Sequence, residues 1–342
     1  MPVTRFSGQA LPADSRIAVF ANDAIGNFVV VTPLLQMLRE AWCPATVDFY
    51  GGRRTWELQA ESDLFDWTYP LWGTAPAKAV EAMLGRMSGA AYDLVVNVES
   101  TYASKVYAGV AAGSHGLVCG PCVADDGRGD LPFADDERGR LWQDRDWIAQ
   151  GLALRYECLT SGFIGEIFCR LCYLQGPIPR YRVPRHAPPV DVPDLLISTA
   201  ASLEEKLWPF DCWVEVLKWA GSHGLSVGLL GASPAAQRQF WQGSTAEDQL
   251  VATGRVTDLR GTMTLPQVAG ALAHARLVLT IDNGILHLAA AGEARTVGLF
   301  RHGFHRLWAP PAPNLAVLTS GNDGPVAEIA LECVLKELER AL

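Results

Sequence analysis

Short apolar runs rich in β-branched and aromatic residues recur along the chain and alternate with stretches of helical apolar spacing. Continuous apolar strands separated by helices are typical of parallel sheets buried on both faces. The pattern therefore predicts an α/β protein with doubly wound parallel sheets. The predicted strands are 16–22, 46–52, 93–99 and 116–120 in the first half, then 194–200, 226–231, 249–254, 276–282, 294–300 and 314–320.

A segment with six prolines, Gln175–Pro193, interrupts this alternation. Proline restricts its own backbone and that of the preceding residue, so the segment is expected to be an extended connector. The expected organisation is a first domain over 1–176, a linker over 177–193 and a second domain over 194–324. The last helix, 325–342, could pack on either domain, the amino-terminal one included. Two such domains leave a cleft at the carboxyl ends of their strands, where ligands of these folds bind.

Composition and charge narrow the class of protein. Of 342 residues 49% are hydrophobic and 19% charged, as in globular proteins, and no apolar run approaches the roughly 20 residues of a spanning helix. The amino terminus lacks a secretory signal, so a cytoplasmic protein with at most peripheral membrane contact is expected. The formal net charge of −9 argues against nucleic acid as the main partner.

The most informative stretch is TIDNGILHLAAAG, Thr280 to Gly292. A strand ends on Asp282, and a helix follows after Asn283, beginning at Gly284. The amino end of a helix carries unpaired N–H groups and about half a unit of positive charge, which suits a phosphate or diphosphate. His287 lies on the same helix face as Asn283 and could contact the ligand. The alternative is that Asp282 and Asn283 only cap the helix.

A lysine upstream strengthens the phosphate hypothesis. Lys206 and Trp208 follow the first strand of the same domain, so their loop is expected at the same end of the sheet. Lys206 could then neutralise the diphosphate that leaves a nucleotide donor. A solvated surface lysine is the alternative.

These segments together resemble a known family. The series STAASLEEKLWPFDCWVEVL, SVGLLGAS, VTDLRGTMTLPQVAGALAHARLVLTIDNGILHLAAAGEARTVGLF and RLWAP resembles the donor domain of family 9 glycosyltransferases, the heptosyltransferases of lipopolysaccharide core assembly. The opening RIAVFANDAIGNFVVVTPLLQMLREAWCPATVDFYGG is similar to that family's first strand, glycine turn and helix. The stretch Asp282 to His287 is the most specific part.

The resemblance implies a GT-B architecture of two Rossmann-like domains, an inverting mechanism, an ADP-heptose type donor, no cofactor and no required metal. Lys206 and the backbone of Asn283 and Gly284 would hold the diphosphate, and Asp282 and His287 would help to bind the donor. The family often has threonine where Asn283 stands.

Two departures from the family concern catalysis and nucleotide choice. The family's catalytic aspartate directly follows the glycine of the first turn, where this chain has Asn27, and an amide cannot take a proton from a hydroxyl. Either Asp23 replaces that base while Asn27 orients the acceptor, or the acceptor needs no strong base, or the chain is not a catalyst. A glutamate that commonly meets the nucleotide ribose is also missing, with Gln237 the nearest candidate.

Other polar clusters are weaker signals. The pairs Cys119/Cys122 and Cys169/Cys172 are separated by 46 residues, against about 15 to 20 in zinc sites, and helical spacing around the second pair indicates core thiols. Arg301 and Arg306, with His302 and His305, follow a strand and are candidate contacts to donor phosphates. The acidic segment 123–147 is either a solvated loop or a flap for the acceptor.

The resulting prediction is an inverting transferase that moves a heptose-type sugar from a nucleotide diphosphate, ADP favoured, to a glycan, lipid-linked or small-molecule acceptor. The alternatives are a sugar-nucleotide epimerase or hydrolase of the same architecture, and a non-catalytic sugar-nucleotide binding protein.

Overall fold

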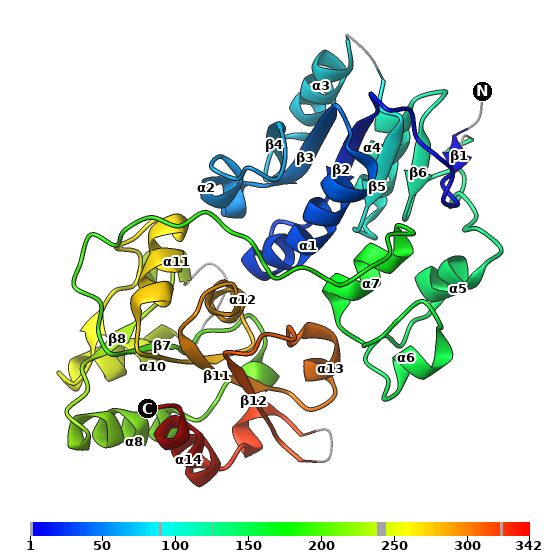
Figure 1. The fold of residues 1–342 in the computed structure, drawn as a ribbon. Helices are drawn as coiled ribbons and strands as arrows, with labels where there is room; N and C mark the ends of the chain where they lie inside the picture. Colours follow the sequence, from blue (N-terminus) through cyan, green and yellow to red (C-terminus); the bar gives the residue numbers. More distant parts are fainter. Residues whose placement is uncertain (1–2, 89–90, 125, 238–243, 322–323) are drawn as a thin grey trace. The chain divides into compact units, whose positions relative to one another are not determined.

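The computed structural model describes residues 3–88, 91–124, 126–237, 244–321 and 324–342. The chain divides into two compact units, Met1–Arg182 and Val183–Leu342, each with one sheet (Figure 1). The division lies within the proline-rich segment that interrupts the strand pattern.

The sheet of the first unit is parallel throughout, in the order β1-β6-β5-β2-β3-β4. On one face, small and apolar residues of the helices α3 (Pro76–Met87) and α4 (Tyr102–Ala112) share a core with Ala18, Phe20 and Val95. The helix α1 (Ile25–Trp42) packs along α7 (Ile164–Leu171). The strands are β1 (Thr4–Arg5), β2 (Arg16–Phe20), β3 (Thr46–Gly52), β4 (Trp67–Trp72), β5 (Leu94–Asn97) and β6 (Leu117–Cys119).

The sheet of the second unit is also parallel, in the order β12-β11-β10-β7-β8-β9. The helices α8 (Phe210–Ser222) and α14 (Leu331–Ala341) cover one face through apolar residues such as Val216 and Leu338. The helices α11 (Leu265–His274) and α12 (Gly284–Ala290) pack against each other, and α12 also packs on β10 and β11. The strands are β7 (Leu195–Ser198), β8 (Val227–Leu229), β9 (Thr257–Asp258), β10 (Leu277–Ile281), β11 (Arg295–Phe300) and β12 (Leu315–Thr319).

Two expectations about elements need comment. The predicted strand over 249–254 is wrong: α10 (Ser244–Ala252) runs through it, and the strand of that region is the later β9. A short run such as Leu250–Ala252 suits a helix as well as a strand, so periodicity alone could not separate them. Of the two packing alternatives for the last helix, the structure has the one on the second unit, where Val334 and Leu338 are fully buried.

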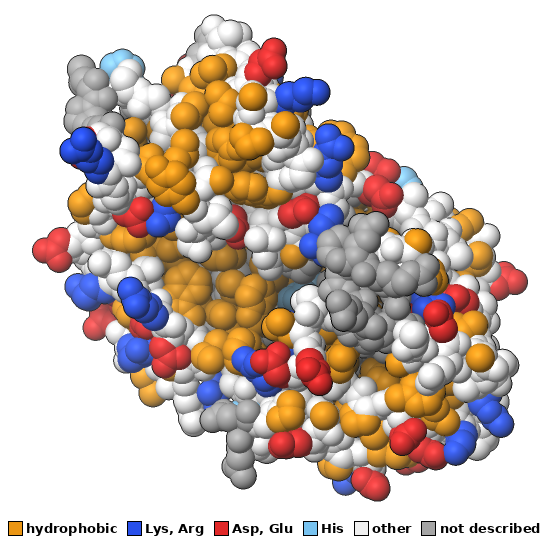
Figure 2. Space-filling model, turned by 180° about the vertical axis from the view of Figure 1, so that it is seen from behind, with side chains coloured by type: hydrophobic (Ala, Val, Ile, Leu, Met, Phe, Trp, Pro, Cys, Tyr) orange, Lys and Arg blue, Asp and Glu red, His pale blue; other side chains and the backbone are white. Residues whose placement is uncertain are grey.

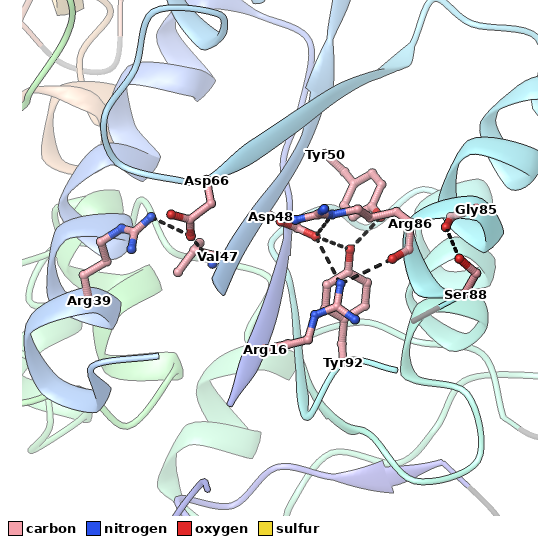
Figure 3. A network of polar contacts seen from close by, with 10 residues as sticks. All are labelled: Arg16, Arg39, Val47, Asp48, Tyr50, Asp66, Gly85, Arg86, Ser88 and Tyr92. Atoms are coloured by element: carbon pink, nitrogen blue, oxygen red, sulfur yellow. Dashed lines mark hydrogen bonds and ion pairs between the residues drawn. The ribbon is translucent and has the colours of Figure 1, made fainter. Parts of the chain in front are cut away.

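A polar network ties the amino-terminal edge of the first sheet together (Figure 3). Asp48 is fully buried on β3 and accepts two hydrogen bonds from Arg86 at the end of α3, at 2.7 and 2.9 Å. The Tyr92 hydroxyl donates to the same carboxylate at 2.7 Å and also bonds the Tyr50 hydroxyl at 2.9 Å. Burial raises the pKa of Tyr50 to about 12. These partners compensate the buried charge, because every carboxylate oxygen has a donor.

Smaller helices and 3₁₀ turns complete the fold: η1 (Arg53–Thr55), α2 (Trp56–Gln59), α5 (Glu137–Gln143), α6 (Leu152–Arg155), η2 (Glu204–Lys206), α9 (Pro234–Gln237), α13 (Phe304–Trp308) and η3 (Val326–Glu328). On the face shown in Figure 2, Lys and Arg side chains are interspersed with Asp and Glu. Within the described ranges, no helix combines the length and the apolar character that crossing a membrane requires.

Candidate functional site

Three neighbouring strands bring the predicted donor-binding residues of the second unit to one edge. β10 lies between β11 and β7, so the segments that follow these three parallel strands emerge side by side. β10 is buried along its whole length and passes through Asp282 into α12. The loop after β7 carries η2, which ends on Lys206.

The side chain of Lys206 points to the turn between β10 and α12. Its Nζ lies 2.7 Å from Oδ2 of Asp282 and 3.3 Å from the backbone oxygen of the same residue. The Asp282 side chain is only 5% exposed, whereas that of Lys206 is 25% exposed. Lys206 therefore neutralises a buried carboxylate and still offers its ammonium group to a ligand in solvent.

Asn283 caps α12 with its own side chain. Its Oδ1 accepts the backbone N–H groups of Ile285 and Leu286 at 2.9 and 3.3 Å. Its Nδ2 donates to Ser198 Oγ and to the Ala200 carbonyl, both at 3.0 Å. The capping alternative is thus realised by this side chain, which also joins the turn to the end of β7. Of the first amides of the turn, the half-exposed N–H groups of Asn283 and Gly284 have no hydrogen bond within the described part of the chain.

His287 is buried beneath the turn. Its Nε2 lies 3.9 Å from Oδ1 of Asp282, and its ring meets Trp308 edge-on at 6.4 Å between centroids. Burial lowers the pKa of His287 to about 4, against an opposing effect of Asp282. The imidazole is therefore neutral near pH 7 and adds no positive charge to the turn.

Arg301 lies beside the η2 loop. It follows β11, and its Nη1 is 3.2 Å from Oε1 of Glu205, the neighbour of Lys206. Arg306 bonds Nε2 of His302 at 3.2 Å, and Nδ1 of His302 bonds the Ser320 carbonyl at 3.1 Å. Arg301 is thus paired with the η2 loop through Glu205, while Arg306 is engaged with its own loop.

Gln237 is a buried amide at the end of α9. Neither its Oε1 nor its Nε2 has a hydrogen-bond partner in the described chain. A Cβ at Gly231 would lie 2.6 Å from that Nε2, so the glycine leaves room for the amide. Arg260, whose side chain also lies close to Gly231, pairs with Glu247, Asp248 and Asp258 at 2.9 to 3.2 Å. Residues 238–243, which follow Gln237 in the predicted nucleotide segment, lie outside the described part.

Trp208 has a structural role. Its ring is buried against Trp213, at 5.2 Å between centroids, and its Nε1 donates to the Ile329 carbonyl at 2.9 Å. It therefore anchors the loop that presents Lys206 to the core of the second unit.

The corresponding edge of the first unit holds Asp23 and Asn27. Asn27 is the third residue of α1, and Ala24 occupies the cap position, so Asn27 is not the helix cap. Asp23 lies in the turn after β2, where its Oδ1 accepts the backbone N–H of Arg54 at 2.8 Å. Desolvation raises the pKa of Asp23, against the opposing effects of that hydrogen bond and of the Arg54 charge.

Sequence reasoning missed a second carboxylate at this edge. Glu99 follows β5, the neighbour of β2, and the register of these strands places it opposite Asn22. Burial raises the pKa of Glu99. The signal was present, because the predicted strand 93–99 ends on this glutamate, as the strand before α12 ends on Asp282.

The cysteines and the acidic segment belong to the first unit. Cys169 and Cys172 are buried, as the helical spacing predicts, and Sγ of Cys172 lies 3.4 Å from Sγ of Cys119. Within the ranges that the structure describes, no group of three or more His, Cys, Asp or Glu side chains is arranged to hold a metal ion. The acidic segment, of which residue 125 lies outside the description, contains α5 and an ion pair between Asp130 and Lys105 at 2.6 Å.

Part of the chain is similar in sequence to known glycosyltransferases. The model of glycosyltransferase family 9 (heptosyltransferase) matches residues 179–339. Lipopolysaccharide heptosyltransferase 1 of Salmonella typhimurium is 28% identical over 101 residues, which are 30% of this chain and 30% of that protein. The matched stretch thus spans under a third of the length of this curated relative.

Solved structures match along nearly the whole chain. The family 9 glycosyl transferase of Veillonella parvula has a TM-score of 0.73 at 14% identity, over 98% of this chain and 99% of that one. The ADP-heptose lipopolysaccharide heptosyltransferase II of E. coli has a TM-score of 0.69 at 15% identity, over 95% and 98%. The E. coli heptosyltransferase WaaC with ADP has a TM-score of 0.65 at 16% identity, over 96% and 100%.

These likenesses, with one six-stranded parallel sheet in each unit, confirm the predicted GT-B fold. The family match covers residues 179–339, the unit that carries Lys206 and the turn before α12, so this unit is similar to glycosyltransferase family 9 (heptosyltransferase).

Proposed function

We propose that this protein is a glycosyltransferase that moves a heptose-type sugar from a nucleotide diphosphate, with ADP favoured, to a hydroxyl of a glycan, lipid-linked or small-molecule acceptor. The observation that carries the proposal is the position of Lys206, whose ammonium group lies at the open turn before α12 in a family 9 domain. Solved relatives hold ADP and ADP-2-deoxy-2-fluoro heptose, which supports this choice of donor.

The charges at the turn suit a diphosphate. Lys206 and Asp282 offset each other, and His287 is neutral, so these three side chains sum to about zero. The remaining positive field comes from the amide N–H groups of Asn283 and Gly284, because Glu205 offsets the charge of Arg301. A diphosphate that binds there replaces solvent around Lys206 and gains a charge-assisted hydrogen bond.

We expect transfer with inversion, as the resemblance to family 9 implies. The acceptor oxygen attacks the anomeric carbon, and the bond from that carbon to the diphosphate oxygen breaks on the opposite side. Negative charge grows on the leaving diphosphate as the bond breaks. Lys206 and the turn amides are in place beforehand, and removing one such donor typically costs about 3 kcal/mol of transition-state stabilisation.

The first unit must receive the proton of the acceptor. Asn27 stands where the family has its catalytic aspartate, and its amide can orient a hydroxyl without accepting the proton. Asp23 is the replacement that the sequence predicts. Gln237, with an unpartnered buried amide, is the candidate contact to the nucleoside.

Nucleotide release tests the proposal against its alternatives. The purified chain is incubated with ADP-heptose and other sugar nucleotides, with and without acceptors extracted from bacterial cells, and mass spectrometry follows free nucleotide and glycosylated product. We expect ADP release that depends on the acceptors. Release without acceptors would indicate a hydrolase or epimerase, and binding without release a non-catalytic protein.

A further inference from the structure

The parallel register places Asn22 and Glu99 opposite each other at the carboxyl-terminal edge of the first sheet. Phe20 at the end of β2 pairs with Asn97 at the end of β5, and the Val98 N–H donates to the Phe20 carbonyl at 3.1 Å. Asn22 and Glu99 each lie two residues beyond that pair. Both are half-buried, so solvent and small molecules reach them.

The backbone of Glu99 is fixed on both sides. Its N–H donates to Oδ1 of Asn97 at 3.0 Å, and its carbonyl accepts the Ser104 hydroxyl of α4 at 3.1 Å. Asn97 is held in turn by a 2.7 Å hydrogen bond to the Pro121 carbonyl. A side chain on such a backbone keeps its position, as a group that must meet a substrate atom requires.

Asn22 joins Glu99 to the start of α1. Its Oδ1 accepts the Ala24 N–H at 2.9 Å, at the cap position of the helix that carries Asn27. Asn22 also acts on the Glu99 carboxylate, whose pKa it lowers against the larger effect of burial. A neutral amide is thus the partner of this carboxylate, which keeps acceptor capacity for a further hydroxyl.

Asp23 has different surroundings. Its Oδ1 accepts the Arg54 N–H at 2.8 Å, and a Cβ at Gly52 would lie 1.9 Å from that oxygen. The carboxylate therefore fills the space that Gly52 leaves at the end of β3 and holds the following turn. A backbone N–H and the Arg54 charge stabilise its anionic form, although desolvation outweighs them and raises the pKa of Asp23. Its carboxylate oxygen is already engaged by the backbone of the turn.

We propose that Glu99, oriented by Asn22, is the general base that deprotonates the acceptor hydroxyl, and that Asp23 is a positioning residue of the neighbouring turn. This assignment rests on the proposed function. The acceptor O–H proton moves to a carboxylate oxygen of Glu99, and the acceptor oxygen bonds to the anomeric carbon. The bond from that carbon to the diphosphate oxygen breaks with its electron pair on the nucleotide, and Glu99 later releases the proton to water.

Charge explains the amide at position 27 on this assignment. A carboxylate at Asn27 would be a third acidic group at an edge that already holds Asp23 and Glu99. Like charges raise one another's pKa and oppose joint ionisation. Moving the base to the neighbouring strand removes the need for an acid at position 27.

The test compares Glu99→Gln, Asp23→Asn and, as a matched control, Glu81→Gln on the exposed face of α3. Both site variants keep the side-chain oxygen that accepts a hydrogen bond but cannot take the proton. The assay measures acceptor-dependent ADP release from ADP-heptose with the bacterial extract, and calorimetry measures ADP binding. We expect Glu99→Gln to lower kcat about 10²- to 10⁴-fold with unchanged ADP affinity. Asp23→Asn should lower kcat much less, and Glu81→Gln should have the kcat of the wild type.

The pH profile separates a base from a structural residue. In the wild type, kcat/KM should fall at acid pH as Glu99 becomes protonated, and Glu99→Asp should keep this acid limb at a reduced rate. Glu99→Gln should lose the limb. Wild-type rates in Glu99→Gln, or a larger loss in Asp23→Asn, would overturn the assignment alone. Absence of acceptor-dependent release by the wild type would overturn the proposed function and this assignment with it.

Discussion

Replacing Lys206 by methionine separates the two tasks that the structure gives to its ammonium group. The methionine keeps an apolar side chain of similar length and removes the charge. In the wild type, that charge contacts both the carboxylate and the backbone carbonyl of Asp282. The variant therefore loses a partner of a buried acid and a cation for the proposed diphosphate.

The two losses have different sizes. Removing one member of a fully buried ion pair typically costs about 3 to 5 kcal/mol of unfolding free energy. Lys206 is a quarter exposed, so water can reach the Asp282 carboxylate, and a discounted loss of about 1 to 3 kcal/mol is expected. A charge-assisted hydrogen bond to phosphate contributes about 1.5 to 3 kcal/mol, which is about 10- to 150-fold in the Kd for ADP.

A double variant distinguishes the effects. In Lys206→Met with Asp282→Asn no buried charge lacks a partner, so most of the lost unfolding free energy should return, while ADP binding stays weak. Urea unfolding followed by tryptophan fluorescence measures the first quantity, and calorimetry with ADP the second. Lys218→Met is the matched control, because Lys218 is 55% exposed on α8 and pairs with Glu215 in a surface contact. Wild-type ADP affinity in Lys206→Met would refute the role of this lysine.

Three further predictions concern stability and access. Burial lowers the pKa of His287 from 6.5 to about 4, so the unfolded chain takes up this proton first as the pH falls. The unfolding free energy should therefore drop between pH 6.5 and 4, by about 3 kcal/mol in total, and urea titrations should show a smaller drop for His287→Gln. Arg86→Met leaves the buried Asp48 carboxylate with Tyr92 and with Arg16 at 3.8 Å. This variant should lower the free energy of unfolding in urea by about 2 to 4 kcal/mol, whereas the exposed Arg340→Met should change it little. Equal urea midpoints of unfolding for these two variants would contradict a stabilising role of the Asp48 network. A chromogenic thiol reagent should modify the exposed Cys43 and Cys333 in the native protein, and the buried Cys119, Cys122, Cys169 and Cys172 only on unfolding.

The parallel sheets could be predicted because their strands are buried on both faces. The strands β2, β5, β7 and β10 are each mostly apolar. When helices separate such runs, a parallel sheet covered on both faces is the structure that they favour. The same logic predicted where polar groups would gather. Lys206 and Asp282 are 76 positions apart in the chain, yet the strand order puts their loops side by side.

What the sequence could not give was the direction of individual side chains. Trp208 and Lys206 are two positions apart in one loop, but the indole turns into the core and the ammonium turns to Asp282. Asn283 was expected to contribute its backbone to a phosphate, and its side chain takes the next two amides of the helix. Both outcomes depend on distant partners, Trp213 and Ile329 for the indole and the end of β7 for Asn283, which local sequence does not encode.

Glu99 shows a different limit. The strand-end rule that selected Asp282 applies equally to the glutamate that closes the predicted strand 93–99, yet the resemblance to a family directed attention to position 27 and its nearest acid. Proximity in sequence favours Asp23, whereas proximity in a parallel sheet favours the residue after the neighbouring strand.

The proposed reaction also explains why the two units carry opposite chemistry at corresponding edges. The leaving diphosphate needs positive charge that is present before the bond breaks, and the second unit supplies it through Lys206 and the turn amides of α12. The incoming hydroxyl needs a carboxylate whose anion is only weakly stabilised, and the first unit supplies one that a single neutral amide holds. On the proposed mechanism, the base and the cation thus come from different units of the chain.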